Sequence, residues 1–153
     1  MSINLLLLST PVAPLGSGLG GGVELTLHNV AQEMRRRGHT IQVVAPLRSV
    51  SESIPIVDIP GKLEISAQTQ ERTTLSMMSS NSVLANMWEY ARQVQGHYDL
   101  MINFAYDWLP FYLTPFFSCP IAHLVSMGSL TDEMDRIIEQ VAVKFPGTIG
   151  VHS

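Results

Sequence analysis

The residues of this chain that are best suited to binding chemistry lie in the glycine-rich stretch at residues 14–24, where five glycines fall between Gly16 and Gly22. An apolar run at residues 3–8 precedes this stretch and a helical pattern follows it, which predicts a strand, a loop and a helix. Bare N–H groups at the amino end of a helix attract anions, and glycine lets a ligand approach the backbone closely. We therefore predict that Gly20, Gly21 and Gly22 bind a phosphate, a diphosphate or a densely hydroxylated ligand. The alternative is a flexible turn that only connects the strand to the helix.

Polar side chains that follow two later strand patterns form a second set of candidates. Asn103, Tyr106 and Asp107 lie at the end of one expected strand, and Ser126 follows the next one. In parallel α/β sheets, ligands bind beyond the carboxyl ends of the strands. We therefore expect these four residues and the glycines to line one ligand-binding crevice.

The whole chain alternates between strand and helix patterns. Continuous apolar strands are typical of a parallel sheet that is covered on both faces, and the two prolines around residues 55–60 favour an edge strand. The sequence thus predicts one α/β domain over residues 1–153, a three-layer arrangement with a mostly parallel sheet flanked by helices. The expected strands are 3–8, 41–45, 54–60, 100–104, 121–125 and 148–151, and the expected helices are 23–37, 82–95, 107–117 and 131–145.

The segment at residues 62–80 fits neither pattern. It is rich in Ser, Thr and Gln and offers little apolar area to offset the entropy of ordering. Long segments of this kind are usually functional or disordered. We predict a mobile or loosely packed loop over the site.

The composition excludes some classes of protein. The net charge of −4 and the pI of about 5.6 argue against a nucleic-acid partner. Charged residues make up only 14% of the chain, which favours a face that packs against something else. The single cysteine, Cys119, permits no disulfide framework, and the first apolar run is too short for a membrane span and lacks signal-peptide flanks. We therefore expect a soluble, cytoplasmic protein.

Other ligand and cofactor classes are less well supported by motif. The series Gly16-x-Gly18-x-x-Gly21 matches the dinucleotide fingerprint in form, but the loop is too long and the second strand ends in Val44-Ala45-Pro46 without an acid. A nucleotide-dependent oxidoreductase is thus a minor alternative. A P-loop is excluded because no Gly-Lys-Ser/Thr follows the glycines. The histidines show no metal-ligand spacing, so no metal and no cofactor are predicted.

Several stretches of the chain carry a family resemblance. The proline-then-glycine loop at residues 11–24 and the stretch Leu27–Val44, which contains Arg37-Gly38-His39, are the most specific. Further matches are Tyr98-Asp99-Leu100 together with Asp107-Trp108, and the terminal residues 147–153. On these motifs the chain resembles the N-terminal domain of a GT-B-fold glycosyltransferase of the family 4 (group 1) type. The resemblance covers nearly all of the sequence except residues 49–80.

The resemblance implies a function and also a missing part. Such enzymes transfer a sugar from a nucleotide-sugar donor to an acceptor without a metal, and the N-terminal domain has a Rossmann-like fold and shapes the acceptor site. The C-terminal donor domain of the family is absent here, so the chain is expected to be inactive alone and to have that domain as its partner. An acceptor at a peripheral membrane surface stays open. Tyr106 and Met127 stand where the family often has histidines, so the resemblance implies no catalytic residue.

A second reading of the same residues is a stand-alone module that uses the glycine loop to bind a sugar or a phosphate. A following domain would distinguish the two. The sequence identifies neither the sugar nor the acceptor.

Overall fold

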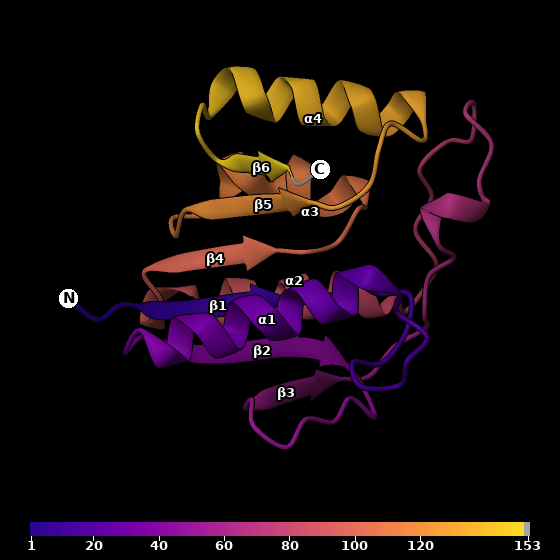
Figure 1. Ribbon diagram of the computed structural model, residues 1–153. Helices are drawn as coiled ribbons and strands as arrows, with labels where there is room; N and C mark the ends of the chain where they lie inside the picture. Colours follow the sequence, from indigo (N-terminus) through magenta and orange to yellow (C-terminus); the bar gives the residue numbers. More distant parts are fainter. Residues whose placement is uncertain (152–153) are drawn as a thin grey trace.

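The computed structural model describes residues 1–151, which form a parallel β-sheet of six strands between layers of helices (Figure 1). This confirms the predicted three-layer α/β class with a Rossmann-like arrangement. The strands are β1 (Asn4–Leu8), β2 (Thr40–Pro46), β3 (Ile56–Ile59), β4 (Leu100–Asn103), β5 (Ile121–Val125) and β6 (Ile149–Val151). The α-helices are α1 (Gly22–Arg36), α2 (Val83–Val94), α3 (Trp108–Leu113) and α4 (Asp132–Lys144), and the 3-10 turns are η1 (Ala67–Thr69), η2 (Gln95–His97) and η3 (Thr114–Phe116).

The strand order determines where a ligand crevice can form. The order across the sheet is β3-β2-β1-β4-β5-β6, and every neighbouring pair is parallel. The chain order reverses between β1 and β4, where Leu8 pairs with Asn103. All six strands point toward one edge of the sheet, here called the carboxyl edge (Figure 1). In sheets of this order, ligands bind at the carboxyl edge beside the reversal.

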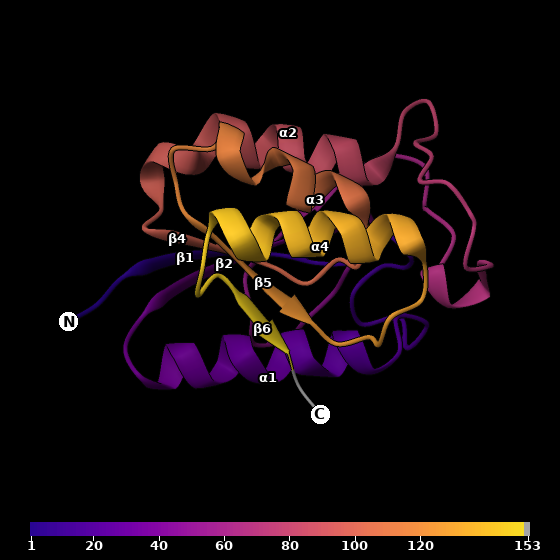
Figure 2. The same ribbon diagram turned by 90° about the horizontal axis from the view of Figure 1, so that it is seen from above.

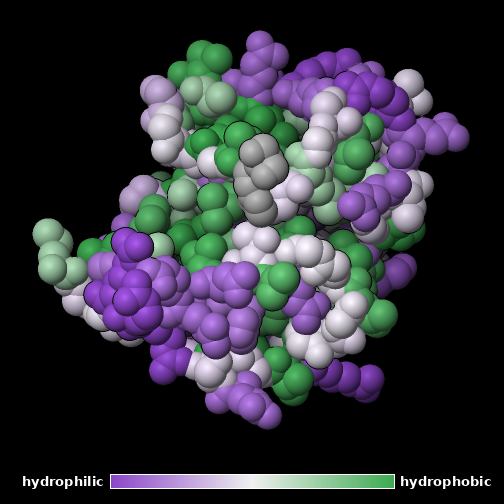
Figure 3. Space-filling model, in the orientation of Figure 1, coloured by the Kyte–Doolittle hydropathy of each residue, from purple (hydrophilic) through white to green (hydrophobic). Residues whose placement is uncertain are grey.

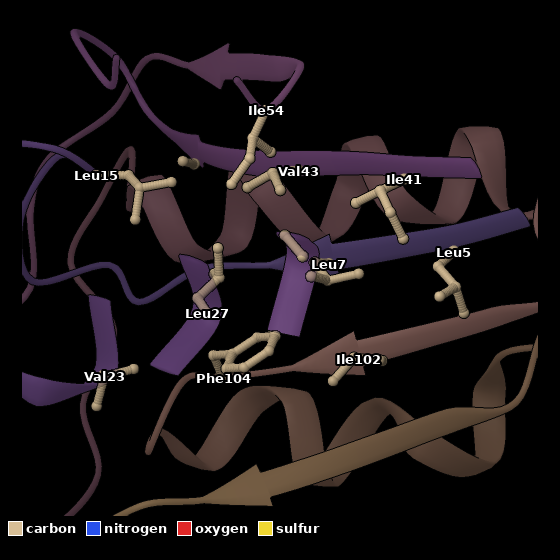
Figure 4. Close-up of a cluster of buried hydrophobic side chains, with 12 residues drawn as sticks. Leu5, Leu7, Leu15, Val23, Leu27, Ile41, Val43, Ile54, Ile102 and Phe104 are labelled. Atoms are coloured by element: carbon tan, nitrogen blue, oxygen red, sulfur yellow. The ribbon is translucent and has the colours of Figure 1, made fainter. Parts of the chain in front are cut away.

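The core explains why β1 reads as an unbroken apolar run. Leu5 and Leu7 project toward α1 and pack with Leu27 (Figure 4). Leu6 and Leu8 project toward α2 and pack with its buried Met87 and Trp88. Each such side chain stabilises the fold by about 1.5–3 kcal/mol when it leaves water. Both faces of the central strand therefore need apolar residues.

The helices divide unequally between the two faces of the sheet. Figure 2 shows α1 on one face, and α2, α3 and α4 on the other. A third apolar cluster joins α3 and α4 through Phe111, Met134 and Ile137. On the α1 face, Figure 3 shows hydrophilic residues over the carboxyl end of α1, where Arg36 and Arg37 bind Glu33, and apolar surface beyond them toward β5 and β6.

The chain between β3 and α2 leaves the sheet in an excursion, defined here as residues 62–81. Its two ends are joined by a bridge between Lys62 and Ser82: the Lys62 N–H donates to the Asn81 carbonyl at 2.8 Å, and the Val83 N–H donates to the Lys62 carbonyl at 2.9 Å. Gly61 makes this closure feasible, since its φ is +148° and a Cβ there would lie 2.6 Å from Cα of Val83.

The excursion crosses the carboxyl edge from β3 toward the start of α4 (Figure 1). Apart from η1 it has no regular structure, and most of its residues are exposed. Arg72 fixes it to α4 by ion pairs with Asp132 (3.2 Å) and Asp135 (2.6 Å). The predicted position over the strand ends is therefore observed, and its mobility stays a prediction.

Two further expectations from the sequence concern the terminal residues 147–153 and the absence of a membrane span. The terminal resemblance at residues 147–153 runs into residues 152–153, which lie outside the described residues. Within residues 1–151, no helix has both the length and the apolar character needed to cross a bilayer.

Candidate functional site

Of the pockets that open at the carboxyl edge within residues 1–151, two lie on either side of the excursion, and a further one, of about 680 Å³, lies between the loops after β1 and β2 and also touches Gly21. The glycine pocket, of about 450 Å³, lies between the amino end of α1 and the loop after β5. The carboxylate pocket, of about 190 Å³, lies between the excursion and the loop that joins β4 to α3. The loop after β1 thus supplies one wall of the glycine pocket, and the loop after β4 supplies one wall of the carboxylate pocket, as expected beside the strand-order reversal.

The glycine pocket is built around the amino end of α1. Gly21 is the N-cap residue and has a φ of +68°, a conformation that residues with a Cβ rarely adopt. Among the described residues, no side chain caps this end of the helix by a hydrogen bond. Gly20, Gly21 and Gly22 all line it. An uncapped helix amino end carries partial positive charge and suits an anionic oxygen.

Glu24, in the first turn of α1, reaches back into the glycine loop. Its carboxylate accepts hydrogen bonds from the N–H groups of Gly16 and of Gly20, the second at 3.3 Å. This acid holds the loop closed and already supplies negative charge to these two amides. A ligand anion at the helix end would therefore bind the amides that follow, at Gly21 and Gly22.

The opposite wall of the glycine pocket comes from two segments that are distant in sequence. Ser126 and Met127 follow β5, and Ser66 and Gln68 belong to the excursion. The structure thus brings the predicted Gly20, Gly21, Gly22 and Ser126 into one pocket. Hydroxyl and amide groups facing a helix amino end are suited to a hydroxylated ligand that also carries negative charge.

Asn103 belongs to neither pocket, because its side chain is committed to an internal network. Its Oδ1 accepts from the N–H of Ala105 at 2.9 Å, and its Nδ2 donates to the Ala105 carbonyl at 3.0 Å. The same Nδ2 lies 3.0 Å from Nδ1 of His123, and Asn103 is 1% exposed. The residue shapes the loop after β4 from within.

His123 completes this network and is held in one tautomer. Its Nδ1 accepts from Asn103 Nδ2, so Nε2 carries the proton and donates to Oγ1 of Thr114 at 2.9 Å, and Thr114 donates in turn to the Pro110 carbonyl at 3.0 Å. The ring stacks on Phe111 with a centroid distance of 4.2 Å. Burial lowers the pKa of His123 to about 4, so the ring is neutral near pH 7. His123 is therefore a structural histidine whose two ring nitrogens both have partners.

The carboxylate pocket contains two acids from different parts of the fold. Asp107 is the N-cap residue of α3 but makes no capping hydrogen bond, and its side chain lines the pocket instead. Glu64, in the excursion, lines the same pocket, and one of its carboxylate oxygens is buried without a hydrogen-bond partner. Burial, and secondarily the negative charge of Glu64, raise the pKa of Asp107 from 3.8 to about 7.

Tyr106 and Arg72 hold the rim of this pocket. The hydroxyl oxygen of Tyr106 accepts from the Leu130 N–H at 3.4 Å, which ties the loop after β4 to the segment before α4. Arg72 binds Ser129 Oγ at 2.8 Å in addition to its two aspartates. Its charge is thus already neutralised outside the pocket, by the carboxylates of Asp132 and Asp135.

The structure therefore divides the predicted residues. The glycines and Ser126 share one pocket, Tyr106 and Asp107 share the other, and Asn103 supports the loop between β4 and α3. Glu64 was not among the predicted residues. Its backbone N–H binds the Pro11 carbonyl at 3.0 Å, a contact between distant segments that leaves no local pattern in the sequence.

Comparison with known proteins adds no assignment: no protein-family model matches the chain, and no curated protein matches it. Among residues 1–151, no three potential metal-ligating side chains gather in one place. What can be said of function rests on the two pockets.

Proposed function

We propose that this chain is the acceptor-side half of a GT-B-fold glycosyltransferase, which transfers a sugar from a nucleotide-sugar donor to an acceptor and which needs a second domain for activity. The observation that carries the proposal is the meeting of an uncapped, glycine-lined helix end and a carboxylate-lined pocket at the strand-order reversal. The sequence resemblance in the glycine loop and in residues 27–44 supports it.

In this proposal the two pockets have different tasks. The amides of Gly21 and Gly22 and the dipole of α1 stabilise the negative charge that develops on the leaving diphosphate. Tyr106 and Asp107, across the excursion, contact the acceptor. The second domain grips the nucleotide and closes against the carboxyl edge.

A stand-alone sugar-binding module is the second candidate. The position of Glu24 favours it, because this carboxylate already fills two amides of the glycine loop and leaves less room for a dianionic diphosphate. The two candidates differ in the ligand that they prefer. The transferase half binds a sugar nucleotide better than the free sugar, and the module does the reverse.

Titration of the chain with UDP-glucose and GDP-mannose, followed by the backbone amide signals in NMR, tests the proposal. We expect weak binding, with a Kd of about 1 mM or above, and shifts at the amides of Gly20, Gly21 and Gly22. A Kd in the low micromolar range, about −8 kcal/mol, would show a complete site and overturn the assignment as one half. Unchanged glycine amides under the same conditions would overturn the site itself.

Gly22→Asp separates anion binding from folding. Gly22 is the first residue of α1, and a Cβ there meets open space, so an aspartate side chain fits. The helix dipole favours this carboxylate, whereas the carboxylate repels a phosphate at the same helix end. We expect binding to weaken at least about fivefold. The matched control is Gly96→Asp, in η2 before β4, where a Cβ also meets open space.

A further inference from the structure

The carboxylate pocket holds more negative charge than its surroundings neutralise. Glu64 and Asp107 both line it, and no hydrogen-bond partner reaches the buried Oε1 of Glu64 within the described chain. Buried carboxylates are normally paired or hydrogen-bonded, because removing their charge from water is costly. An unpartnered carboxylate oxygen that shares one cavity with a second carboxylate therefore calls for a partner that the described chain does not provide.

The cavity is large enough for an organic group. Its volume of about 190 Å³ compares with about 10–15 Å³ for a single water molecule. The remaining lining is largely apolar or aromatic and includes Met77, Met78 and Trp108. Thioether and indole surfaces pack against carbon chains, and an indole face also attracts a cation.

A divalent metal ion fits this lining poorly. Calcium takes about six to eight oxygen ligands and magnesium keeps an octahedral shell of oxygens, whereas two carboxylates and methionine side chains offer far fewer hard ligands. A protonated amine needs only a few hydrogen-bond acceptors, and the carbon atoms attached to it match the apolar lining.

We propose that the carboxylate pocket binds a primary ammonium group, held between Glu64 and Asp107 with its carbon chain against Met77, Met78 and Trp108. The inference deepens the proposed function and rests on it in one respect: it assigns an amino group to the acceptor of the transferase. The amine serves for recognition and takes no part in the transfer step.

The experiment compares two small probes that differ only at one end, 4-aminobutan-1-ol and butane-1,4-diol. The chain contains two tryptophans, of which Trp108 lines the pocket and Trp88 lies in the core beside α2. The indole N–H signals therefore give a reporter and an internal reference in one NMR spectrum. We expect the amine to shift the Trp108 signal saturably at constant ionic strength, the diol to leave it unchanged, and Trp88 to stay unchanged with both.

Variants assign the effect to the acids. Asp107→Asn and Glu64→Gln keep the size of each side chain and remove its charge, and each should weaken amine binding at least about tenfold. Asp58→Asn, at an exposed carboxylate on β3, is the matched control and should bind as the parent chain does. Equal shifts with the diol, no shift with the amine, or unchanged binding by Asp107→Asn would each overturn the proposal.

The pH adds an independent readout. Between about pH 8 and pH 6 the amine stays protonated, whereas Asp107 gains a proton, so affinity should fall about tenfold. Around Asp107, Tyr106 stays neutral because burial raises its pKa, and His123 behind the loop stays neutral because burial lowers its own. Glu64 faces it from the excursion, and Arg72, Asp132 and Asp135 are paired with one another at the start of α4. An affinity that is independent of pH would contradict the role of Asp107.

Failure of this inference is distinguishable from failure of the proposed function. The amine titration contains no nucleotide and reports on Trp108, whereas the sugar-nucleotide titration reports on the glycine amides. Amine binding without nucleotide binding would remove the transferase and leave the ammonium site. The converse result would leave the transferase with an acceptor that lacks an amine.

Discussion

Two groups of polar side chains lie on either side of the loop between β4 and α3, and they differ in how well they are satisfied. On the inner side, His123 has a partner at each ring nitrogen, Asn103 and Thr114. On the outer side, Glu64 keeps a buried carboxylate oxygen without a partner, and Asp107 caps nothing at the start of α3.

This difference indicates that the two groups have different roles in the molecule. A buried polar network with every donor and acceptor matched rigidifies its surroundings, whereas unmatched buried polar groups are costly and need an explanation. The inner network fixes the backbone at Ala105, and so places Tyr106 and Asp107, which begin where it ends. The inner group stabilises the fold, and the outer group lowers its stability, as expected of the ligand site that we propose there.

Removal of the inner group should have the largest effect. His123→Ala leaves a cavity beside Phe111 and removes the partners of two buried side chains, so we expect a loss of about 3 kcal/mol in the free energy of unfolding. Urea denaturation measures it. The control is His97→Ala, at an exposed position in η2, for which we expect a change below about 0.5 kcal/mol. Equal losses in the two variants would show that the network adds nothing.

Removal of the outer charge should have the opposite sign. The pKa of Asp107 is raised from 3.8 to about 7 in the folded state. Its contribution to the free energy of unfolding is therefore fully present below the unfolded-state pKa and is lost as the pH rises through the folded-state pKa. Asp107→Asn avoids that loss. We expect a gain of about 2 kcal/mol near pH 8, after allowance for partial exposure, and none at the acidic end. A variant that is less stable than the parent at both pH values would contradict this.

His123 and Asp107 should affect the pH dependence of unfolding in opposite directions. The pKa of His123 is lowered from 6.5 to about 4, so its contribution is lost as the pH falls through that interval, whereas the Asp107 contribution is lost as the pH rises through nearly the same interval. The two slopes oppose each other, and each is at most about 1.4 kcal/mol per pH unit. We expect the profile of the parent chain to be flatter than that of Asp107→Asn, which should fall clearly toward acid. Identical profiles would contradict the opposition.

Release of the excursion should have the smallest effect on global stability. Arg72 is 49% exposed and its ion pairs are on the surface, so Arg72→Ala should cost no more than about 1 kcal/mol. Hydrogen exchange of the excursion amides should nevertheless accelerate, while that of β1 stays unchanged. Arg136→Ala, which removes another exposed ion pair on α4, is the control and should leave the excursion unaffected.

Most of the fold could be predicted from sequence because its signals are local. The apolar run of β1, the helical spacing in α1 and α4, and the prolines around edge strand β3 each specify their element within a residue or two. Cys119 and Trp88 both lie in the core. These features follow from burial on one face or two, which the periodicity of a short window reveals.

The site could be predicted only in part because its assembly depends on contacts between distant segments. Nothing near Asn103 distinguishes a strand-end amide that faces a ligand from one that faces His123, twenty positions later. The predicted single crevice becomes two pockets because the excursion passes between them, and its path depends on Arg72 and on the backbone bond from Glu64 to Pro11. Side-chain periodicity carries no information about such pairings.

The two ends of the excursion are joined at Gly61 and at the Lys62–Ser82 bridge. The residues between these two ends can therefore be exchanged as one module. Because the two ends meet through backbone hydrogen bonds, a longer or shorter segment can be inserted there while β3 and α2 keep their places. Doubling the length of such a loop costs only about 0.6 kcal/mol in closure entropy. The sheet can thus acquire a different ligand preference through a change confined to one surface segment, by replacing Glu64 and the methionines together, without any change to the core.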